Sequence, residues 1–451
     1  MISLIVFLFA DARSQTIPNT LTNAEKVYGL SKFWQETNYN FVYLNRVNRQ
    51  AWDSLYVVMI NNVQQTKNDY EYYRELQRFC AFLKDGHTNV YFPQAVDSLI
   101  FRSMFGKYRL VLENIGGKPI IAYTNPANRD EVPVGSEIIS VNNMPTQQYI
   151  DQYVKPYISS STDYVLEDNC VASLLQGFKG QAFDIKIKLP AGGTKDLHLV
   201  HERTADITLY PAVPQQGLCE LKWYPNNVAY LAVNTFGTDK VDTIFKSKLP
   251  ELYKAKSLII DLRNNGGGST DIGAYILQYL TADSVLKGSK STTRIHEAAF
   301  KAWGKGVHDT VNNGWAKKAY LDSRDARYED LNSGYIYKPD MTKQKIIVPT
   351  VVLVSHGTAS AAEDFLVLAD KQKHIIKMGE NSFGSTGQPL MFDMPGGGSA
   401  RVCTKQDTYP DGREFVGYGI KPDIEVKKTV KDFIENKDPV LDRALSYLNK
   451  K

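Results

Sequence analysis

The 451-residue sequence has no apolar run long enough to cross a bilayer. Residues 2–10 (ISLIVFLFA) form a short apolar run, followed by the small-x-small site at residues 10–12. This length fits the core of a secretory signal, although no lysine or arginine precedes it, and a buried strand is the alternative. We expect residues 1–14 to be an export signal that begins downstream of the true start, and a periplasmic or secreted protein with no stable membrane insertion after its removal.

The sequence also lacks an excess of one charge. It contains 53 Lys and Arg against 49 Asp and Glu, a net charge of +4, and the two signs are interspersed. No basic stretch resembles a nucleic-acid-binding surface, so no nucleic-acid partner is expected.

Cysteine is scarce, and no metal-binding pattern is present. The four cysteines are widely separated and form no CxxC pair. No group of histidine, cysteine and carboxylate residues has the spacing of a metal site, so we expect no metal and no other cofactor. The cysteines either form one of three possible pairings or remain buried free thiols.

The chain divides by pattern into three regions after residue 14. Residues 15–100 have apolar and aromatic residues three and four apart, which predicts a helical N-terminal domain. Residues 101–205 alternate like strands, and segments 109–113 and 118–123 flank Gly116-Gly117 as in a hairpin. The run GSEIISVNN (135–143) resembles the strand and turn of PDZ domains, with an unrelated β-rich insert as the alternative.

Residues 206–451 alternate strands with helices from Val228 onward, which is typical of stacked β-α units and predicts an α/β domain. Between them, residues 282–344 are polar and aromatic and are expected to form an irregular insertion. The expected strands are 228–235, 257–262, 348–355 and 374–378, and the expected helices are 270–280 and 360–370.

The most informative motif surrounds Ser360. An apolar strand leads through small residues to Ser360, at the start of a helix, where unpaired N–H groups carry partial positive charge. Such groups stabilise the oxyanion that forms when a serine attacks a carbonyl, each being worth about 3–4 kcal/mol. The alternative is a capping box in which Ser360 and Glu363 only cap the helix.

A second motif, SLIIDLRNNGGG (257–268), ends a buried strand in three glycines. Successive glycines allow close backbone approach and expose N–H groups. Phosphate binding is the competing interpretation, but the stretch has neither the Gly-Lys-Ser/Thr of a P-loop nor a GxGxxG pattern.

Together these motifs resemble the S41 serine peptidases, which include the carboxyl-terminal processing proteases, the tricorn core protease and the interphotoreceptor retinoid-binding repeats. The family hallmark D-L-R-x-N-x-G-G matches residues 261–268, and its nucleophile turn T-A-S-A-x-E matches 358–363. Matches continue through 379–384 and 419–423. The resemblance implies a crotonase/ClpP-like catalytic domain with Ser360 as nucleophile.

One departure affects the mechanism. The processing proteases carry a catalytic lysine in F-G-K-G, whereas residues 383–386 here read FGST. Another base is therefore needed, and His87 is the candidate because its ordinary pKa suits a general base near neutral pH. The tricorn-like branch is similar in using a histidine from an N-terminal segment; the alternative is that His87 only compensates a helix dipole.

The sequence offers a second candidate base, and two candidates for the carboxylate that would orient the ring of His87. His356, four residues before Ser360, is a rival base. The tricorn-like branch has a glutamate before its G-V-x-P-D motif, and Glu414 is the nearest match, with Asp411 as the alternative. Where that branch has a serine before the histidine, this chain has Gly86.

The predicted function is therefore a serine endopeptidase acting on extended or unfolded polypeptides. The oxyanion donors are expected to be the N–H groups of Ala361 and of Gly266 or Gly267. The PDZ-like domain is expected to recruit a substrate's C-terminal carboxylate by strand addition. A non-catalytic binding protein for peptides or apolar ligands, and an esterase using the same Ser–His pair, remain the alternatives.

Overall fold

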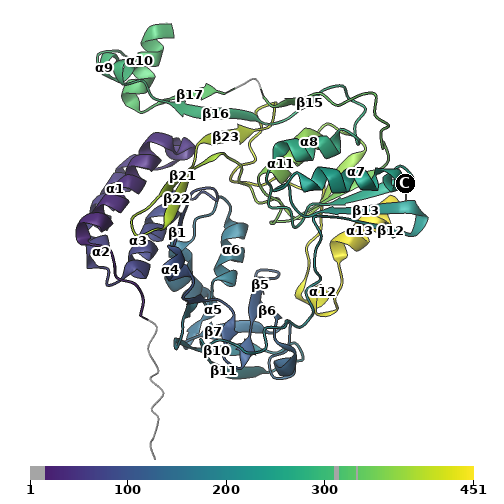
Figure 1. Ribbon diagram of the computed structural model, residues 1–451, viewed down its shortest axis with the longest axis horizontal. Coiled ribbons are helices and arrows are strands. Elements are labelled where there is room, and N and C mark those ends of the chain that lie inside the picture. Colours follow the sequence, from purple (N-terminus) through teal and green to yellow (C-terminus); the bar gives the residue numbers. More distant parts are fainter. Residues whose placement is uncertain (1–15, 309–313, 332–333, 451) are drawn as a thin grey trace, which may run out of the picture.

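The computed structural model describes residues 16–308, 314–331 and 334–450. The expected export signal at residues 1–14 lies outside the described residues. The fold is mixed α/β, as predicted (Figure 1). Over the described ranges, no helix combines the length and apolarity needed to cross a bilayer.

Three helices form the N-terminal part, as predicted: α1 (Asn23–Asn40), α2 (Arg49–Gln65) and α3 (Asp69–Ala81). Buried Trp52 stacks on Phe79 with ring centroids 4.0 Å apart. The following strand, β1 (Asn89–Tyr91), pairs antiparallel with β22 (Ser399–Cys403). Because of this pairing, the N-terminal helices and the C-terminal part of the chain share one hydrophobic core, and Figure 1 shows α1 and α3 beside β21 and β22.

A β-rich unit with a separate core follows. Its six-stranded sheet has the order β11-β10-β7-β6-β5, with β8 paired to β7. The hairpin expected around Gly116-Gly117 is confirmed by the antiparallel pair β5 and β6. The main elements are β5 (Val111–Asn114), β6 (Pro119–Tyr123), β7 (Glu137–Val141), α6 (Asp163–Ala172), β10 (Ala182–Lys188) and β11 (Thr194–Val200). Shorter elements are α4 (Gln94–Asp97), β2 (Ile100–Phe101), β3 (Met104–Phe105), β4 (Tyr108–Arg109), β8 (Met144–Pro145), α5 (Thr146–Tyr149) and β9 (Gly177–Phe178).

The C-terminal region is built on a six-stranded sheet of order β12-β13-β14-β19-β20-β24. All pairs are parallel except β12 with β13. The predicted strands are β13 (Val228–Val233), β14 (Ser257–Asp261), β19 (Thr350–Val354) and β20 (Ile375–Gly379), with β12 (Cys219–Tyr224) and β24 (Ile424–Glu425) at the edges. The predicted helices are α8 (Thr270–Leu277) and α11 (Ala361–Ala369).

Helices cover both faces of this sheet, which explains its continuously apolar strands. On one face α7 (Lys240–Leu252), α8 and α11 join the large core. On the other face α13 (Pro439–Leu448) packs on Val228, Ile259 and Val351. Strands β14 and β19 lie side by side, so the turns that follow them meet at the same edge of the sheet.

The prediction of an irregular insertion at residues 282–344 is wrong. Strand β16 (Lys290–Ile295) pairs with β17 (Arg327–Asp330) and β23 (Lys405–Thr408), and two helices connect β16 to β17. These helices, α9 (Ala298–Gly304) and α10 (Gly314–Arg324), project from the rest of the molecule (Figure 1). We call β16, α9, α10 and β17 the arm. The remaining short elements are β15 (Leu286–Lys287), β18 (Ile336–Tyr337), β21 (Pro389–Asp393) and α12 (Val430–Ile434).

The cysteines are free thiols rather than disulfides, which is one of the two states predicted for them. Cys80, Cys170, Cys219 and Cys403 are all buried and free. Burial raises the pKa of each thiol, so none is activated as a thiolate at neutral pH.

Candidate active site

Ser360 has an unusual backbone conformation. It follows β19 and precedes α11, with φ 55° and ψ −124°. An ordinary N-cap residue is extended with negative φ, and few residues other than glycine adopt positive φ. Strained residues of this kind cluster at functional sites. The Ser360 N–H donates to Glu363 Oε2 over 3.2 Å, as in a capping box, but capping alone does not account for the strained backbone.

The glycine turn after β14 lies directly against Ser360. At Gly267, φ is +98° and a Cβ would lie 2.7 Å from the Cβ of Ser360 and 2.9 Å from the nitrogen of Ala361. Only a glycine fits there. The motif thus brings Gly267, Ser360 and Ala361 together, as the sequence predicts for an oxyanion site.

The structure distinguishes the two candidate glycines. The Gly267 N–H donates to Asn265 Oδ1 over 2.9 Å, and the Asn265 amide in turn donates to the Val233 carbonyl over 3.0 Å. Gly266 is exposed, with no atom within 4 Å of its Cβ position. Of the two N–H groups, that of Gly267 is already bonded, whereas the Gly266 N–H donates to no other described residue.

Buried Glu363 is the centre of the local hydrogen bonds. Oε1 accepts from Ser382 Oγ at 2.6 Å and Gly384 N–H at 2.8 Å. Oε2 accepts from the N–H groups of Ser360 and Ser385, both at 3.2 Å. Burial raises the pKa of Glu363 to about 8, and the four donors oppose that shift. One carboxylate therefore fixes the Ser360 turn and the 382–385 loop relative to each other.

His87 reaches the same place through Ser385. Its Nδ1 lies 2.6 Å from Ser385 Oγ, and Ser385 is fully buried. Ser385 and Ser360 donate their N–H groups to the same oxygen of Glu363, so the imidazole adjoins the serine turn. Within the described chain, no hydrogen bond joins His87 to Ser360 directly.

The surroundings of His87 keep its ring neutral. Burial, followed by the positive charge of Arg401, lowers the pKa of His87 to about 4. The Arg401 guanidinium is held 2.7 Å from Asn89 Oδ1 and 3.4 Å from the Gly86 carbonyl. At neutral pH the imidazole therefore has a free lone pair with which to accept a proton.

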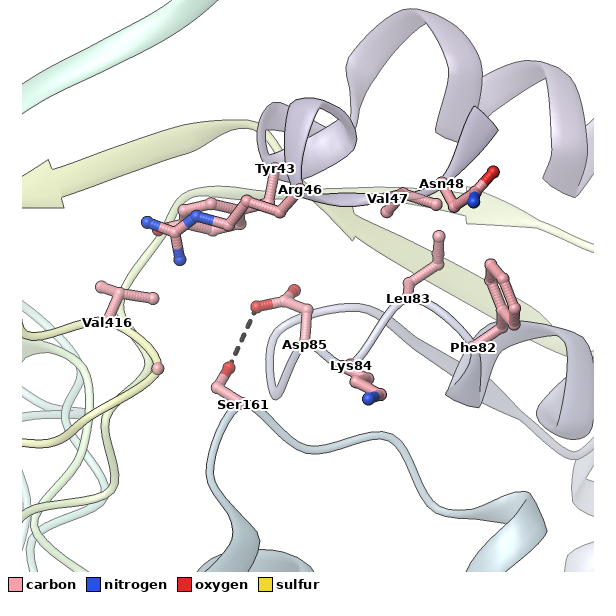
Figure 2. Close-up of a pocket in the computed structure, with 11 residues that line it drawn as sticks. Tyr43, Arg46, Val47, Asn48, Phe82, Leu83, Lys84, Asp85, Ser161 and Val416 are labelled. Carbon is pink, nitrogen blue, oxygen red and sulfur yellow. Dashed lines mark hydrogen bonds between the residues drawn. The ribbon is translucent and has the colours of Figure 1, made fainter. Parts of the chain in front are cut away.

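The loop that carries His87 is anchored by buried Asp85. Asp85 Oδ2 accepts from Thr88 Oγ1 at 2.6 Å. Asp85 Oδ1 accepts from Ser161 Oγ at 3.2 Å, the dashed line in Figure 2. Ser161 Oγ also accepts from the Gly86 N–H at 2.8 Å. Burial raises the pKa of Asp85, and these hydrogen bonds oppose the shift. The β-rich unit therefore helps to place His87.

A pocket of about 410 Å³ opens beside this loop. Figure 2 shows Asp85 and Ser161 facing Arg46 and Tyr43 across it. Its lining combines apolar side chains with a few charged ones. The lining residues are Tyr43, Arg46, Val47, Asn48, Phe82, Leu83, Lys84, Asp85, Ser161, Val416 and Gly417.

The expected carboxylate partner of His87 is placed elsewhere. Glu414 pairs with Arg46 over 3.2 Å, and its side chain is 46% exposed. Asp411 pairs with Arg413 over 2.9 Å. In the part of the chain that the structure describes, neither carboxylate is hydrogen-bonded to His87, so these contacts do not support the orienting role expected for them.

The rival base His356 is occupied by the β-rich unit. Its Nδ1 lies 2.6 Å from Asp168 Oδ2, and its ring stacks on Tyr164 at 4.4 Å between centroids. It makes no hydrogen bond to Ser360 among the described residues. His356 therefore joins two parts of the fold.

Sequence reasoning missed three residues of this site: Asn265, which fixes the glycine turn; Glu363, considered only as a cap; and Ser385. Ser385 could have been found, because it stands where the processing proteases have their lysine. None of the three belongs to a metal site, since the described residues contain no group of three histidine, cysteine or carboxylate side chains able to hold a metal ion.

Comparison with known structures shows another protein of the same fold. Mature CPAF, solved in complex with lactacystin, superposes with a TM-score of 0.66 over 96% of this chain and 98% of that one, at 16% identity. At this identity the likeness concerns the fold.

Sequence comparison identifies the family. The carboxy-terminal processing protease CtpA of Bacillus subtilis is 23% identical over 304 residues, covering 66% of this chain and 52% of CtpA. Carboxyl-terminal-processing peptidase 2 of Arabidopsis chloroplasts (Arabidopsis thaliana) is 22% identical over 415 residues, covering 89% of this chain and 70% of that protein. The chain thus spans about half the length of CtpA. Residues 227–426 match the family model of peptidase family S41, and this part of the chain belongs to that family.

Proposed function

We propose that this chain is a serine-type endopeptidase that hydrolyses extended or unfolded polypeptides, with Ser360 as nucleophile and His87 as general base. One observation carries the proposal: Glu363 Oε2 accepts from both Ser360 and Ser385, while Ser385 Oγ contacts His87. A strained serine at a helix start is thereby coupled to a neutral imidazole.

In the proposed reaction, Ser360 Oγ attacks the substrate carbonyl and His87 takes its proton. The resulting imidazolium then protonates the leaving amine, and water hydrolyses the acyl-enzyme by the same steps. The Ser360–His87 hydrogen bond forms when substrate closes the site, as catalytic hydrogen bonds often tighten only in the complex.

We assign Ser385, rather than Glu414, as the positioning residue for His87. When Ser385 Oγ accepts a hydrogen bond from the Nδ1–H group, Nε2 carries the lone pair that takes the proton of Ser360. A hydroxyl orients the ring as a carboxylate would, without adding negative charge next to it. This assignment fits the contacts of Glu414, which pairs with Arg46 and makes no hydrogen bond to His87 among the described residues.

The oxyanion is bound by the N–H groups of Ala361 and Gly266. Ala361 is the first residue of α11, where backbone N–H groups lack helical partners. Gly266 supplies the N–H of the glycine turn that has no hydrogen-bond acceptor among the described residues. Gly267 provides the close packing against Ser360 instead.

Two further features belong to the same proposal. The β-rich unit is PDZ-like and recruits the C-terminal carboxylate of a substrate by strand addition. The protein acts after export, in the periplasm or outside the cell.

The test uses the full chain with a fluorophosphonate probe and with casein. Probe labelling at Ser360 and casein hydrolysis, both lost in Ser360→Ala, are the expected results. His87→Ala should lower hydrolysis by about 10²–10⁴-fold, the usual contribution of a general base. Full activity of His87→Ala would overturn the base assignment.

The same experiment separates the alternatives. A binding protein on this fold would leave the probe unreacted, and Ser360→Ala would retain its ligand affinity. An esterase would react with the probe and cleave small esters, but would leave casein intact.

A further inference from the structure

The two helices of the arm present aromatic rings to solvent. Trp303 on α9 and Trp315 on α10 are 53% and 52% exposed, with ring centroids 5.7 Å apart. Phe300 lies beside both rings, at 5.4 Å and 6.1 Å. The arm projects away from the rest of the molecule in Figure 1.

The same helices are rich in positive charge. Lys301, Lys305, Lys318 and Arg324 lie on α9, on α10 or next to them, and none forms an ion pair with another described residue. Lys318 is three residues after Trp315 on α10, so the two side chains share a helix face.

The acidic groups at the base of the arm do not neutralise these cations. Asp322 is buried against Arg327 at 2.6 Å, and Glu297 pairs with the same arginine at 2.6 Å. Asp325 pairs with Arg294 at 3.0 Å. The carboxylates hold the arm together, and its outer helices keep an excess of positive charge.

Paired indoles flanked by cations fit the boundary of an anionic bilayer. Tryptophan favours the headgroup level, where its ring is apolar and its N–H can bond, and lysine and arginine attract anionic headgroups. A second copy of the chain fits less well, because two such arms would bring like charges together. The helices, of 7 and 11 residues, are too short to span a membrane.

We propose that the arm is a peripheral membrane-docking element that inserts Trp303 and Trp315 at the surface of a membrane rich in anionic lipid. Docking of this kind is reversible and independent of the reaction at Ser360. It would hold the enzyme beside a membrane without a spanning segment.

The test is sedimentation of the full chain with vesicles of phosphatidylcholine alone or mixed with phosphatidylglycerol. We expect binding to the mixed vesicles at least about tenfold tighter than to the neutral ones, and weakening as salt is raised, since each surface cation contributes about fivefold. Trp303→Ala/Trp315→Ala and, separately, Lys305→Glu/Lys318→Glu should each weaken binding at least about tenfold. Casein hydrolysis in solution should be unchanged in both, which also shows that they fold.

Matched controls change similar residues elsewhere. Trp223→Ala removes an indole on β12 that is 40% exposed, and Lys179→Glu/Lys256→Glu reverses two exposed charges. Both should bind as the unaltered protein does.

Absence of vesicle binding, or equal binding by the arm variants and the unaltered chain, would overturn the proposal. Light scattering that shows self-association lost in Trp303→Ala/Trp315→Ala, without vesicle binding, would instead make the arm an interface between copies.

Discussion

Ser385 is small and packs closely on the His87 loop. A Cβ at Gly86 would lie 3.2 Å from the Cβ of Ser385 and 2.7 Å from the ring of Phe383. The approach of the two loops therefore requires a residue without a side chain at position 86. This explains why the serine that precedes the histidine in tricorn-like enzymes could not stand here without displacing Phe383 or Ser385.

Replacing Ser385 by alanine should slow hydrolysis without removing the nucleophile. Loss of one hydrogen bond that orients His87 should lower kcat about tenfold, with KM little changed. Ser385→Thr keeps a hydroxyl and should recover part of the rate. Steady-state kinetics on a peptide substrate measures both.

Glu414→Gln is the matched control for this prediction. Since Glu414 pairs with Arg46 at a half-exposed site, its neutralisation should change kcat less than threefold, the size of an ordinary surface ion pair. A large loss in Glu414→Gln with normal activity in Ser385→Ala would restore the carboxylate as the orienting group.

The pKa of His87 predicts the acid limb of activity. Because the ring charges only near pH 4, kcat/KM should stay level well below pH 6.5 and then fall. Arg401→Gln removes the nearby positive charge, so the limb should move to higher pH. Arg443→Gln, at an exposed site, should leave the limb in place.

The lowered pKa of His87 also makes the free energy of unfolding depend on pH. The folded pKa of about 4 lies below the ordinary value of 6.5, so between these values the unfolded chain binds a proton that the folded chain does not. The contribution of His87 to the free energy of unfolding is therefore complete above pH 6.5 and is lost as pH falls toward 4. Denaturant titrations should show a smaller loss over this window in Arg401→Gln than in the unaltered chain.

At this scale, short ordered sequence patterns predicted roles for Ser360, His87 and the glycines. They did not locate the partners. Ser385 and His87 are 298 residues apart, and no local pattern records which hydroxyl meets the ring. Glu414 was expected from spacing, whereas its contacts depend on the position of Arg46 in a distant segment.

At the scale of elements, two turns determine the geometry around Ser360: the turn after β14 and the turn before α11. Both follow adjacent parallel strands, and they touch at Gly267 and Ser360. Their packing should be sensitive to a single methyl group.

Gly267→Ala should destabilise the protein by about 1–3 kcal/mol and abolish hydrolysis, since it combines a strained φ with a clash against Ser360. Gly266→Ala has open space around it and should change the free energy of unfolding by less than about 0.5 kcal/mol. Denaturant unfolding compares the two. Equal stability of both variants would show that the turn can relax.

Helices and strands could be predicted where buried residues recur at a regular spacing along the sequence. The predicted strands β13, β14 and β19 are mostly apolar because helices cover both faces of their sheet. The arm was missed because its strand β16 pairs with the distant β23 and its helices bury little, so neither leaves a clear apolar period in the sequence.

Across the whole molecule, one segment of the β-rich unit contacts both the loop of His87 and the loop of Ser385. Ser161 bonds the Gly86 N–H, and the Tyr164 hydroxyl donates to the Ser382 carbonyl over 2.6 Å. Asp168 holds His356, four residues before Ser360. The position of the β-rich unit should therefore affect catalysis.

Tyr164→Phe should lower kcat several-fold, because the loop of Ser385 loses a partly buried hydrogen bond worth about 1 kcal/mol. Fluorophosphonate labelling of Ser360 should slow in parallel. Tyr153→Phe, which alters a 48% exposed tyrosine in the same unit, should have no effect. Unchanged kinetics in Tyr164→Phe would show that the two loops are held without the β-rich unit.

The contact between Ser385 and His87 has a consequence for how this family can change its chemistry. A lysine at position 385 would need the volume that the imidazole now fills, so the amine and the ring exclude each other. A site that uses the histidine therefore cannot become one that uses the lysine through a single substitution. The histidine loop would have to withdraw as the longer side chain arrives, and an intermediate form with neither base in place would be inactive.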